Sequence, residues 1–175
     1  MIRFYFDEAK AVETLVYIAS AWPKITPFYL SKVVFIADRD HLRQYGRPVT
    51  GDAYVAMDNG PVPSRIYDII KGDLDFFGNP AAIADALTIS QEDSKYHQIT
   101  AKRKANTDLL SETDITALDR AIEFCRDKSF TKLSSLTHQE PAWLQAQRNA
   151  EMDPELLVPE EMREEVREAA AYALL

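Results

Sequence analysis

Residues 26–45 are apolar around most of the surface that a helix would present. Thr26 followed by Pro27 is typical of an N-cap and first helical position, and Gly46 is suited to ending the helix. The plainly polar positions between these ends form a narrow strip of three residues: Lys32, Arg39 and Arg43. A helix with so little polar surface must be covered on nearly every side, so this segment predicts a fold built around one central helix.

The rest of the chain predicts further helices and a small sheet. The 175 residues, of which 46% are apolar, have the size and hydrophobicity of one globular domain with a substantial core. Helical spacing and capping signals predict helices at residues 7–21, 63–72, 111–125, 131–137 and 141–148, and another from about Pro159. We expect a sharp turn at residues 59–61 and a loop at 78–80. Alternation predicts a strand at 53–57 and a hairpin of strands 87–90 and 96–101 joined by residues 91–94.

The predicted fold class is therefore α+β and mainly α-helical: a single compact helical domain with a small antiparallel β-sheet or hairpin. The net charge is −8 and the pI about 4.9, which argues against a duplex-DNA binder, because such proteins use Lys and Arg to displace counterions. Eight acidic residues against two arginines give residues 151–175 a local charge of −6. We therefore expect a nearly neutral body, residues 1–150, and an acidic C-terminal helical extension, residues 151–175, packed on or near the same domain.

The sequence holds no recognisable catalytic or metal-binding motif. The three histidines are far apart, no cysteine pair exists, and the five glycines never cluster, which excludes the spacings of zinc sites, phosphate loops and nucleophile elbows. Asp38 and Asp40 diverge by about 200° on a helix, so they do not form an acid–base pair. The single cysteine, Cys125, lies on an apolar stripe and is predicted to be a buried, inert thiol. We expect no enzyme activity, no cofactor and no metal.

The single cysteine also bears on location, because it excludes an internal disulfide and suits a reducing, cytoplasmic setting. We expect neither a signal peptide nor a membrane span. One basic run, Lys102-Arg103-Lys104, follows the second hairpin strand. A basic hairpin beside helices is compatible with a winged-helix-like transcription regulator or another DNA-contacting protein. We prefer the simpler interpretation, a run of solvated charges beside a loop.

Glycine and proline are concentrated between residues 45 and 67, where they fix the backbone path. Within this run Asp52 and Asp58 flank the predicted strand and can bond loop amides. Tyr54 and Tyr67 offer amphipathic surface of the kind favoured in binding patches. The run therefore predicts a rigid scaffold that also presents two tyrosines to a partner.

A second unusual run covers residues 136–143. Thr137 or His138 is expected to cap the helix that Pro141 enters, and Trp143 to anchor that helix to the core. The alternative is that this run contacts a partner directly, because buried aromatic anchors serve both purposes.

These runs resemble the Panacea domain, a family also called SocA-like antitoxins and phage-associated GepA-type proteins. The resemblance spans about residues 10–148 and rests on the stretches 32–42, 45–52, 60–64 and 136–143. It implies a mainly helical bacterial or phage antitoxin domain with a small sheet, which neutralises a cognate protein toxin by binding it. Family members are paired with many unrelated toxins, so the resemblance does not identify the toxin that this chain would bind. The motif residues with an expected structural role are Asp38, Gly46, Pro48, Gly51, Asp52, Gly60, Pro61, His138, Pro141 and Trp143.

We expect the toxin to contact two groups of residues. On the last helix, Met162, Val166 and Tyr172 lie beside a row of glutamates that would attract a basic toxin. Tyr54 and Tyr67 form the second group. The alternative for the last helix is that its apolar stripe packs on the body and leaves the glutamates in water. The expected partner is a cognate toxin encoded next to this chain, with no membrane or nucleic-acid contact, and a homo-oligomer is left open.

Overall fold

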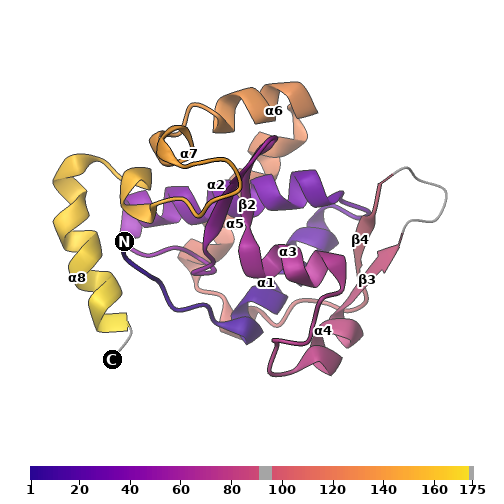
Figure 1. The fold of residues 1–175 in the computed structure, drawn as a ribbon. Coiled ribbons are helices and arrows are strands. Elements are labelled where there is room, and N and C mark those ends of the chain that lie inside the picture. Colours follow the sequence, from indigo (N-terminus) through magenta and orange to yellow (C-terminus); the bar gives the residue numbers. More distant parts are fainter. Residues whose placement is uncertain (91–95, 174–175) are drawn as a thin grey trace.

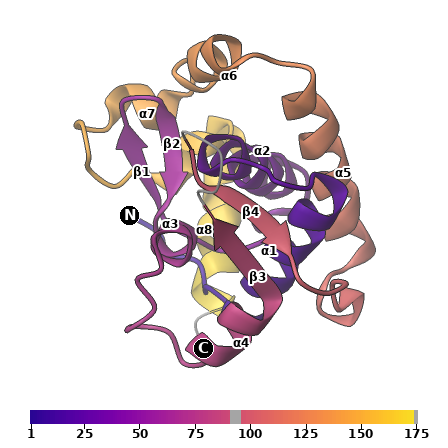
Figure 2. The same ribbon diagram turned by 90° about the vertical axis from the view of Figure 1, so that its right-hand side faces the viewer.

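The computed structural model describes residues 1–90 and 96–173, and α2 (Pro27–Tyr45) runs through its centre, as the sequence predicts (Figure 1). Every residue of α2 from 30 to 38 is buried. Figure 2 looks nearly along this helix and shows α1 (Glu8–Ala21), α5 (Glu112–Arg126), α6 (Phe130–Thr137) and a β-hairpin around it. The apolar circumference of the helix is therefore covered by packing on all sides.

Local capping signals fix the ends of the main helices. The Asp7 side chain accepts the Lys10 N–H at 3.0 Å at the start of α1. Ser111 and Asp114 form the predicted capping box at the start of α5. Gly46 ends α2 with a φ of 72°, a left-handed conformation that glycine adopts without steric cost.

The first hairpin pairs β1 (Tyr54–Met57) with β2 (Gly60–Pro63) in antiparallel register and packs against α2. A later segment extends the ladder on the other side of β1. Asn149 N–H donates to the Ala56 carbonyl at 2.8 Å, and Met152 N–H donates to the Tyr54 carbonyl at 2.8 Å. Backbone hydrogen bonds therefore hold the start of the acidic extension on this hairpin.

We expected a turn at residues 59–61 followed directly by a helix, but the structure has the strand β2 between them. Proline lacks an N–H, so two prolines within four residues argue against a strand. Here Pro61 and Pro63 lie opposite Ala56 and Tyr54, whose backbone groups bond to residues 149–152 instead. The prolines thus occupy positions where the antiparallel ladder needs no donor. The helix α3 follows at once and spans Ser64–Lys71.

The second hairpin, β3 (Leu87–Ser90) with β4 (Gln98–Ala101), confirms the predicted pair of strands. Its predicted connection at residues 91–94 lies outside the described residues. The expected loop at 78–80 is present at Gly78 and Asn79, but Pro80 already begins a helix that was not expected, α4 (Pro80–Ala86). The Asn79 side chain accepts a main-chain N–H in the first turn, and Pro80 occupies the first helical position. A capping residue followed by proline also marks the start of α2, but a helix as short as α4 shows little helical periodicity in the sequence.

The remaining elements are short apart from the last helix. They are η1 (Thr107–Leu109), α7 (Pro141–Gln145), η2 (Pro154–Leu157), η3 (Glu160–Met162) and α8 (Arg163–Ala173). The predicted last helix thus starts with a 3₁₀ turn after Pro159. α8 lies at the opposite end of the molecule from the β3–β4 hairpin (Figure 1). It buries Val166 and Ala170, so its apolar stripe packs on the body.

The fold is α+β and mainly helical, with two small antiparallel hairpins among the described residues. No helix in residues 1–90 or 96–173 has the length and apolar character needed to cross a membrane.

Candidate functional site

Asp38, buried on α2, is the centre of a hydrogen-bonded cluster. One carboxylate oxygen accepts the Thr50 N–H at 2.8 Å, and the other accepts the hydroxyls of Thr50 at 2.5 Å and Tyr54 at 2.7 Å. Burial raises the pKa of Asp38, and the three donors oppose that shift. The expectation that Tyr54 lies on a partner surface needs correction, because the ring is 6% exposed and its hydroxyl is used inside.

Asp52 joins the same region to the start of α3. Its two oxygens accept the N–H groups of Arg65 at 3.0 Å and Ile66 at 2.9 Å, as the prediction of amide bonding requires. Burial raises the pKa of Asp52 to about 7, opposed by these amides. Asp58 has a different role from the one expected, because it is exposed at the hairpin tip and pairs with Arg148.

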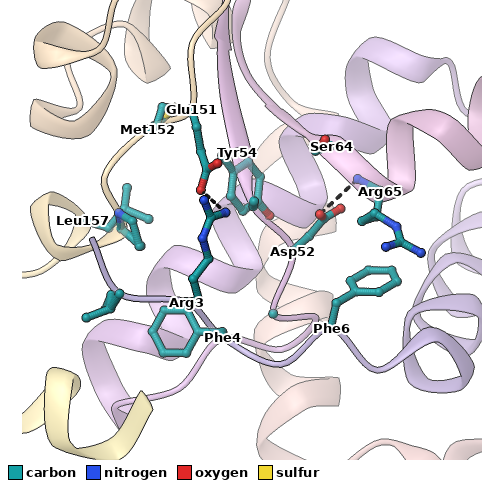
Figure 3. A pocket seen from close by; sticks show the side chains of 14 residues that line it. Arg3, Phe4, Phe6, Asp52, Tyr54, Ser64, Arg65, Glu151, Met152 and Leu157 are labelled. Carbon is teal, nitrogen blue, oxygen red and sulfur yellow. Dashed lines mark hydrogen bonds and ion pairs between the residues drawn. The ribbon is translucent and has the colours of Figure 1, made fainter. Parts of the chain in front are cut away.

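Figure 3 shows a pocket of about 310 Å³ beside Asp52, between the N-terminal segment, the start of β1 and residues 151–157. Arg3 reaches across this pocket to an ion pair with Glu151. Gly51 is required at its edge, since a Cβ there would lie 2.1 Å from the Tyr5 carbonyl oxygen. The charged groups drawn in the view are largely committed to internal pairs, so this pocket offers few groups to a ligand.

A larger hollow, about 700 Å³, lies between the start of α2, the tip of the first hairpin and the first turn of α6. We call it the Lys32 groove. Its aromatic walls include Phe28 and Phe130, whose ring centroids are 4.2 Å apart, and Tyr67 from α3. Phe130 is 46% exposed, so an aromatic face is open to solvent beside the hollow. Of the two tyrosines expected to meet a partner, Tyr67 lines this groove.

Lys32 lines the groove. Its burial corrects the expectation that it belongs to a polar strip on α2. Its side chain is 1% exposed, and its ammonium donates to the Pro61 carbonyl at 2.9 Å and lies 5.0 Å from the centroid of the Phe28 ring. Burial lowers the pKa of Lys32 to about 7. The sequence offered one signal for this: the residues one helical turn before and after Lys32 are apolar or aromatic (Phe28, Tyr29, Phe35 and Ile36).

The other two members of that strip, Arg39 and Arg43, are partly exposed and bind Glu140 of the second motif, residues 136–143. Arg39 donates to Glu140 at 2.6 Å and Arg43 donates to the other oxygen of Glu140 at 2.9 Å. Glu140 occupies the N-cap position of α7. The prediction that Thr137 or His138 caps this helix is therefore wrong. The Thr137 hydroxyl donates back to the Leu133 carbonyl at 3.0 Å within α6.

Trp143 anchors α7, as predicted, and does so at the hairpin that borders the groove. Its indole N–H donates to the Met57 carbonyl at 3.1 Å, and its ring stacks on His138 with centroids 3.9 Å apart. Pro141 is the exposed first residue of α7. The second motif therefore holds the tip of the hairpin in place.

Gly60 lies where two stretches of the family resemblance, residues 32–42 and 136–143, approach each other. Its φ is 107°, and a Cβ there would lie 2.4 Å from the Thr137 hydroxyl oxygen and 3.0 Å from the Lys32 ammonium nitrogen. A side chain at this position would therefore clash with Thr137 and crowd the Lys32 ammonium. Pro48, by contrast, lies half-buried in the loop between α2 and β1 and contributes nothing to the groove lining.

The residues of the last helix that we expected to contact the toxin differ in how far they are buried. Val166 is fully buried and so is not available as a surface contact. Met162 is partly buried against the core, whereas Tyr172 is 81% exposed. The stripe of α8 thus follows the alternative interpretation, and Tyr172 is its exposed aromatic residue.

Metal ligands do not gather in the part of the chain that the structure describes, where no group of three or more His, Cys, Asp or Glu side chains is placed to hold an ion. Cys125 is buried on α5, and burial raises its pKa to about 12, so the thiol is protonated at neutral pH.

Comparison with known proteins gives one match. The family model described as antitoxin SocA-like, Panacea domain, matches residues 30–144, which include most of α2, both hairpins and the second motif. None of the curated proteins and none of the solved structures matches the chain. The match covers well over half of the sequence and all of the motif residues discussed above, and the chain therefore belongs to the antitoxin SocA-like, Panacea domain family.

Proposed function

We propose that this chain is an antitoxin that neutralises a cognate protein toxin by binding it directly, and that it has no catalytic activity of its own. Membership of the SocA-like family supports the antitoxin role. The observation that carries direct binding is the Lys32 groove, a hollow of about 700 Å³ with exposed aromatic walls. Protein interfaces concentrate their binding energy in desolvated pockets around a few anchor side chains.

The groove is also held in a fixed shape by the family motifs. The Trp143 indole bonds to the Met57 carbonyl at the hairpin tip, and the Lys32 ammonium bonds to the Pro61 carbonyl at the floor. A wall that is already ordered loses little conformational entropy on binding, which favours affinity. A preformed, partly apolar surface of this kind suits a protein partner.

The basic run gives no comparable support for DNA contact. Arg103 forms two hydrogen bonds with the buried Glu13 carboxylate, at 2.9 and 2.6 Å, and Lys102 donates to the Ala84 carbonyl at 3.0 Å. All three residues of the run are exposed, as expected of solvated charges, but Arg103 and Lys102 are also engaged by the body of the protein rather than held free for phosphates. We therefore do not propose a transcription regulator.

The test is co-expression with the product of each neighbouring gene. We expect one product to arrest growth when expressed alone, growth to recover when this chain is present, and the two proteins to co-purify as a stable complex. A neighbouring toxin that this chain neither rescues nor binds would contradict the proposal.

Purified proteins then separate binding from catalysis. A binding antitoxin neutralises in proportion to its amount, so toxin activity should fall linearly up to the stoichiometric point and return when the complex is dissociated. Neutralisation by a small fraction of one equivalent, with a mass change on the toxin, would show an enzyme instead.

A further inference from the structure

The Lys32 ammonium is buried without a full set of partners. An ammonium carries three N–H donors. Among the described residues its acceptor is the Pro61 carbonyl oxygen at 2.9 Å, and the Phe28 ring lies at 5.0 Å. Two donors are therefore available on a side chain that is 1% exposed. Burying an ammonium with unused donors costs free energy unless an anion or further acceptors bind those donors.

Among the described residues, no anionic side chain pairs with the Lys32 ammonium. The group on α5 that faces Lys32 is the Cys125 thiol, which burial keeps protonated. At the hairpin tip, Asp58 is already paired with Arg148. The other titratable groups lining the groove are Tyr29, Tyr67, Tyr96 and His97, and none of them is a carboxylate. The uncompensated charge at the floor is therefore positive.

The shape of the groove adds an apolar requirement to this charge. Phe28 and Phe130 pack against each other on one side, with their ring planes tilted by 38°, and Met57 and Val62 from the hairpin line another. Such walls favour burial of an apolar or aromatic side chain. The chain as a whole carries a net charge of −8, so a cationic floor is a local exception and favours an anionic group at this one place.

We propose that the Lys32 groove binds an acidic segment of the toxin, with an apolar side chain between the aromatic and hairpin walls and a carboxylate on the Lys32 ammonium. This inference rests on the proposed function, because it requires that the toxin is bound directly. It assigns Lys32 a role in binding, whereas its contact with Pro61 alone would be structural.

The experiment uses the toxin identified by co-expression and three variants of the full chain. Lys32→Met removes the charge and all donors, and Lys32→Gln keeps a donor for the Pro61 carbonyl without the charge. Lys104→Met is the matched control, because Lys104 is exposed and lies outside the groove. Both Lys32 variants should lose toxin affinity at least tenfold while remaining folded by circular dichroism, and the control should bind like the wild type.

Lys32→Gln separates a binding role from a structural one. If the lysine only clamps Pro61, the glutamine variant should restore binding, and that result would overturn the proposal. If the carboxylate contact exists, complex formation should take up protons near pH 7.5, measured by calorimetry in two buffers of different ionisation enthalpy. The Lys32→Gln complex should lose this uptake.

The toxin side is tested by neutralising its Asp and Glu residues one at a time. At least one Asp→Asn or Glu→Gln change should weaken binding tenfold and add nothing further when combined with Lys32→Gln. Absence of any such coupled carboxylate would overturn the proposal. A wild-type chain that fails to bind the toxin at all would instead refute the proposed function, so the two failures are distinguishable.

Discussion

Asp38 and Lys32 lie six residues apart on α2, and both are buried, yet their surroundings differ. Three donors from Thr50 and Tyr54 surround the Asp38 carboxylate at 2.5 to 2.8 Å. The Lys32 ammonium has the Pro61 carbonyl and an aromatic ring. The first group is completed by its own fold, and the second is left with spare donors at the floor of a hollow.

The difference separates two uses of a buried charge. A carboxylate that is fully hydrogen-bonded specifies the fold, because each donor would lose a partner if it were removed. An ammonium with spare donors lowers the stability of the free protein and gains from a ligand that supplies an anion. The central helix therefore carries a scaffold residue and a binding residue on different faces, and substitutions at the two positions should act in opposite directions.

The largest effect is expected for Asp38→Ala. The change leaves the Thr50 N–H, the Thr50 hydroxyl and the Tyr54 hydroxyl without their acceptor in the core, which should lower the free energy of unfolding by about 3 kcal/mol or more. Urea denaturation measures this directly. Asp40→Ala is the matched control, because Asp40 is 51% exposed, and it should change stability by less than about 1 kcal/mol. Equal losses in the two variants would contradict the scaffold role of Asp38.

Next in size is Gly60→Ala, at the point where the motifs meet. The added Cβ would lie 2.4 Å from the Thr137 hydroxyl oxygen, and the φ of 107° is itself unfavourable for alanine. We expect a loss of about 2–3 kcal/mol from overpacking and backbone strain together. Gly72→Ala has a similar positive φ of 77° with nothing within 4 Å, so it should cost only about 1 kcal/mol. If the two glycines respond alike, steric contact at Gly60 is not the cause.

Lys32→Met should raise stability, by about 2 kcal/mol at pH 6, because methionine fills the site without a buried charge. The folded pKa of Lys32 is about 7, below the value near 10.4 expected for an unfolded lysine. Between these values the unfolded state holds the proton and the folded state does not, so this group makes the wild type more stable as pH rises. The advantage of the variant should therefore shrink from pH 7 to pH 10. A variant that is destabilised throughout this range would show that the lysine is structurally required.

The helices of the scaffold were largely predictable from the sequence because their signals are local. The polar strip, caps and glycine stop of α2 lie within twenty residues, and they predicted a central helix correctly. The motif residue Asp38 was expected to be structural, but its partners were not identified. Thr50 and Tyr54 come 12 and 16 residues later, and only the folded chain places them beside α2.

The binding face was harder to predict, because burial depends on elements distant in sequence. Lys32 looks polar in the sequence and becomes buried when Pro61 and the rest of the first hairpin pack over α2. The first strand of that hairpin was predicted at residues 53–57, but the second was not, since prolines at 61 and 63 disfavour a strand unless the ladder needs no donor there. Tyr54 was placed on the surface for a related reason. Its amphipathic character fits a binding patch as well as a buried hydroxyl that serves a carboxylate.

The smallest effect, and the sharpest test of the division between scaffold and groove, is expected for Tyr54→Phe. The change keeps the ring packed edge-on against Phe35, at 5.1 Å between centroids, and removes one of the three donors to Asp38. Two donors remain, so the free energy of unfolding should fall by about 1 kcal/mol, and toxin affinity should be unchanged because Tyr54 is not in the Lys32 groove. Tyr67→Phe is the matched control for stability: that tyrosine lines the groove, its hydroxyl has no hydrogen bond among the described residues, and the change should cost less than about 0.5 kcal/mol. Loss of toxin binding in a folded Tyr54→Phe protein would show that the toxin depends on the Tyr54 region rather than on the Lys32 groove. The roles assigned to Asp38 and Lys32 would then be wrong.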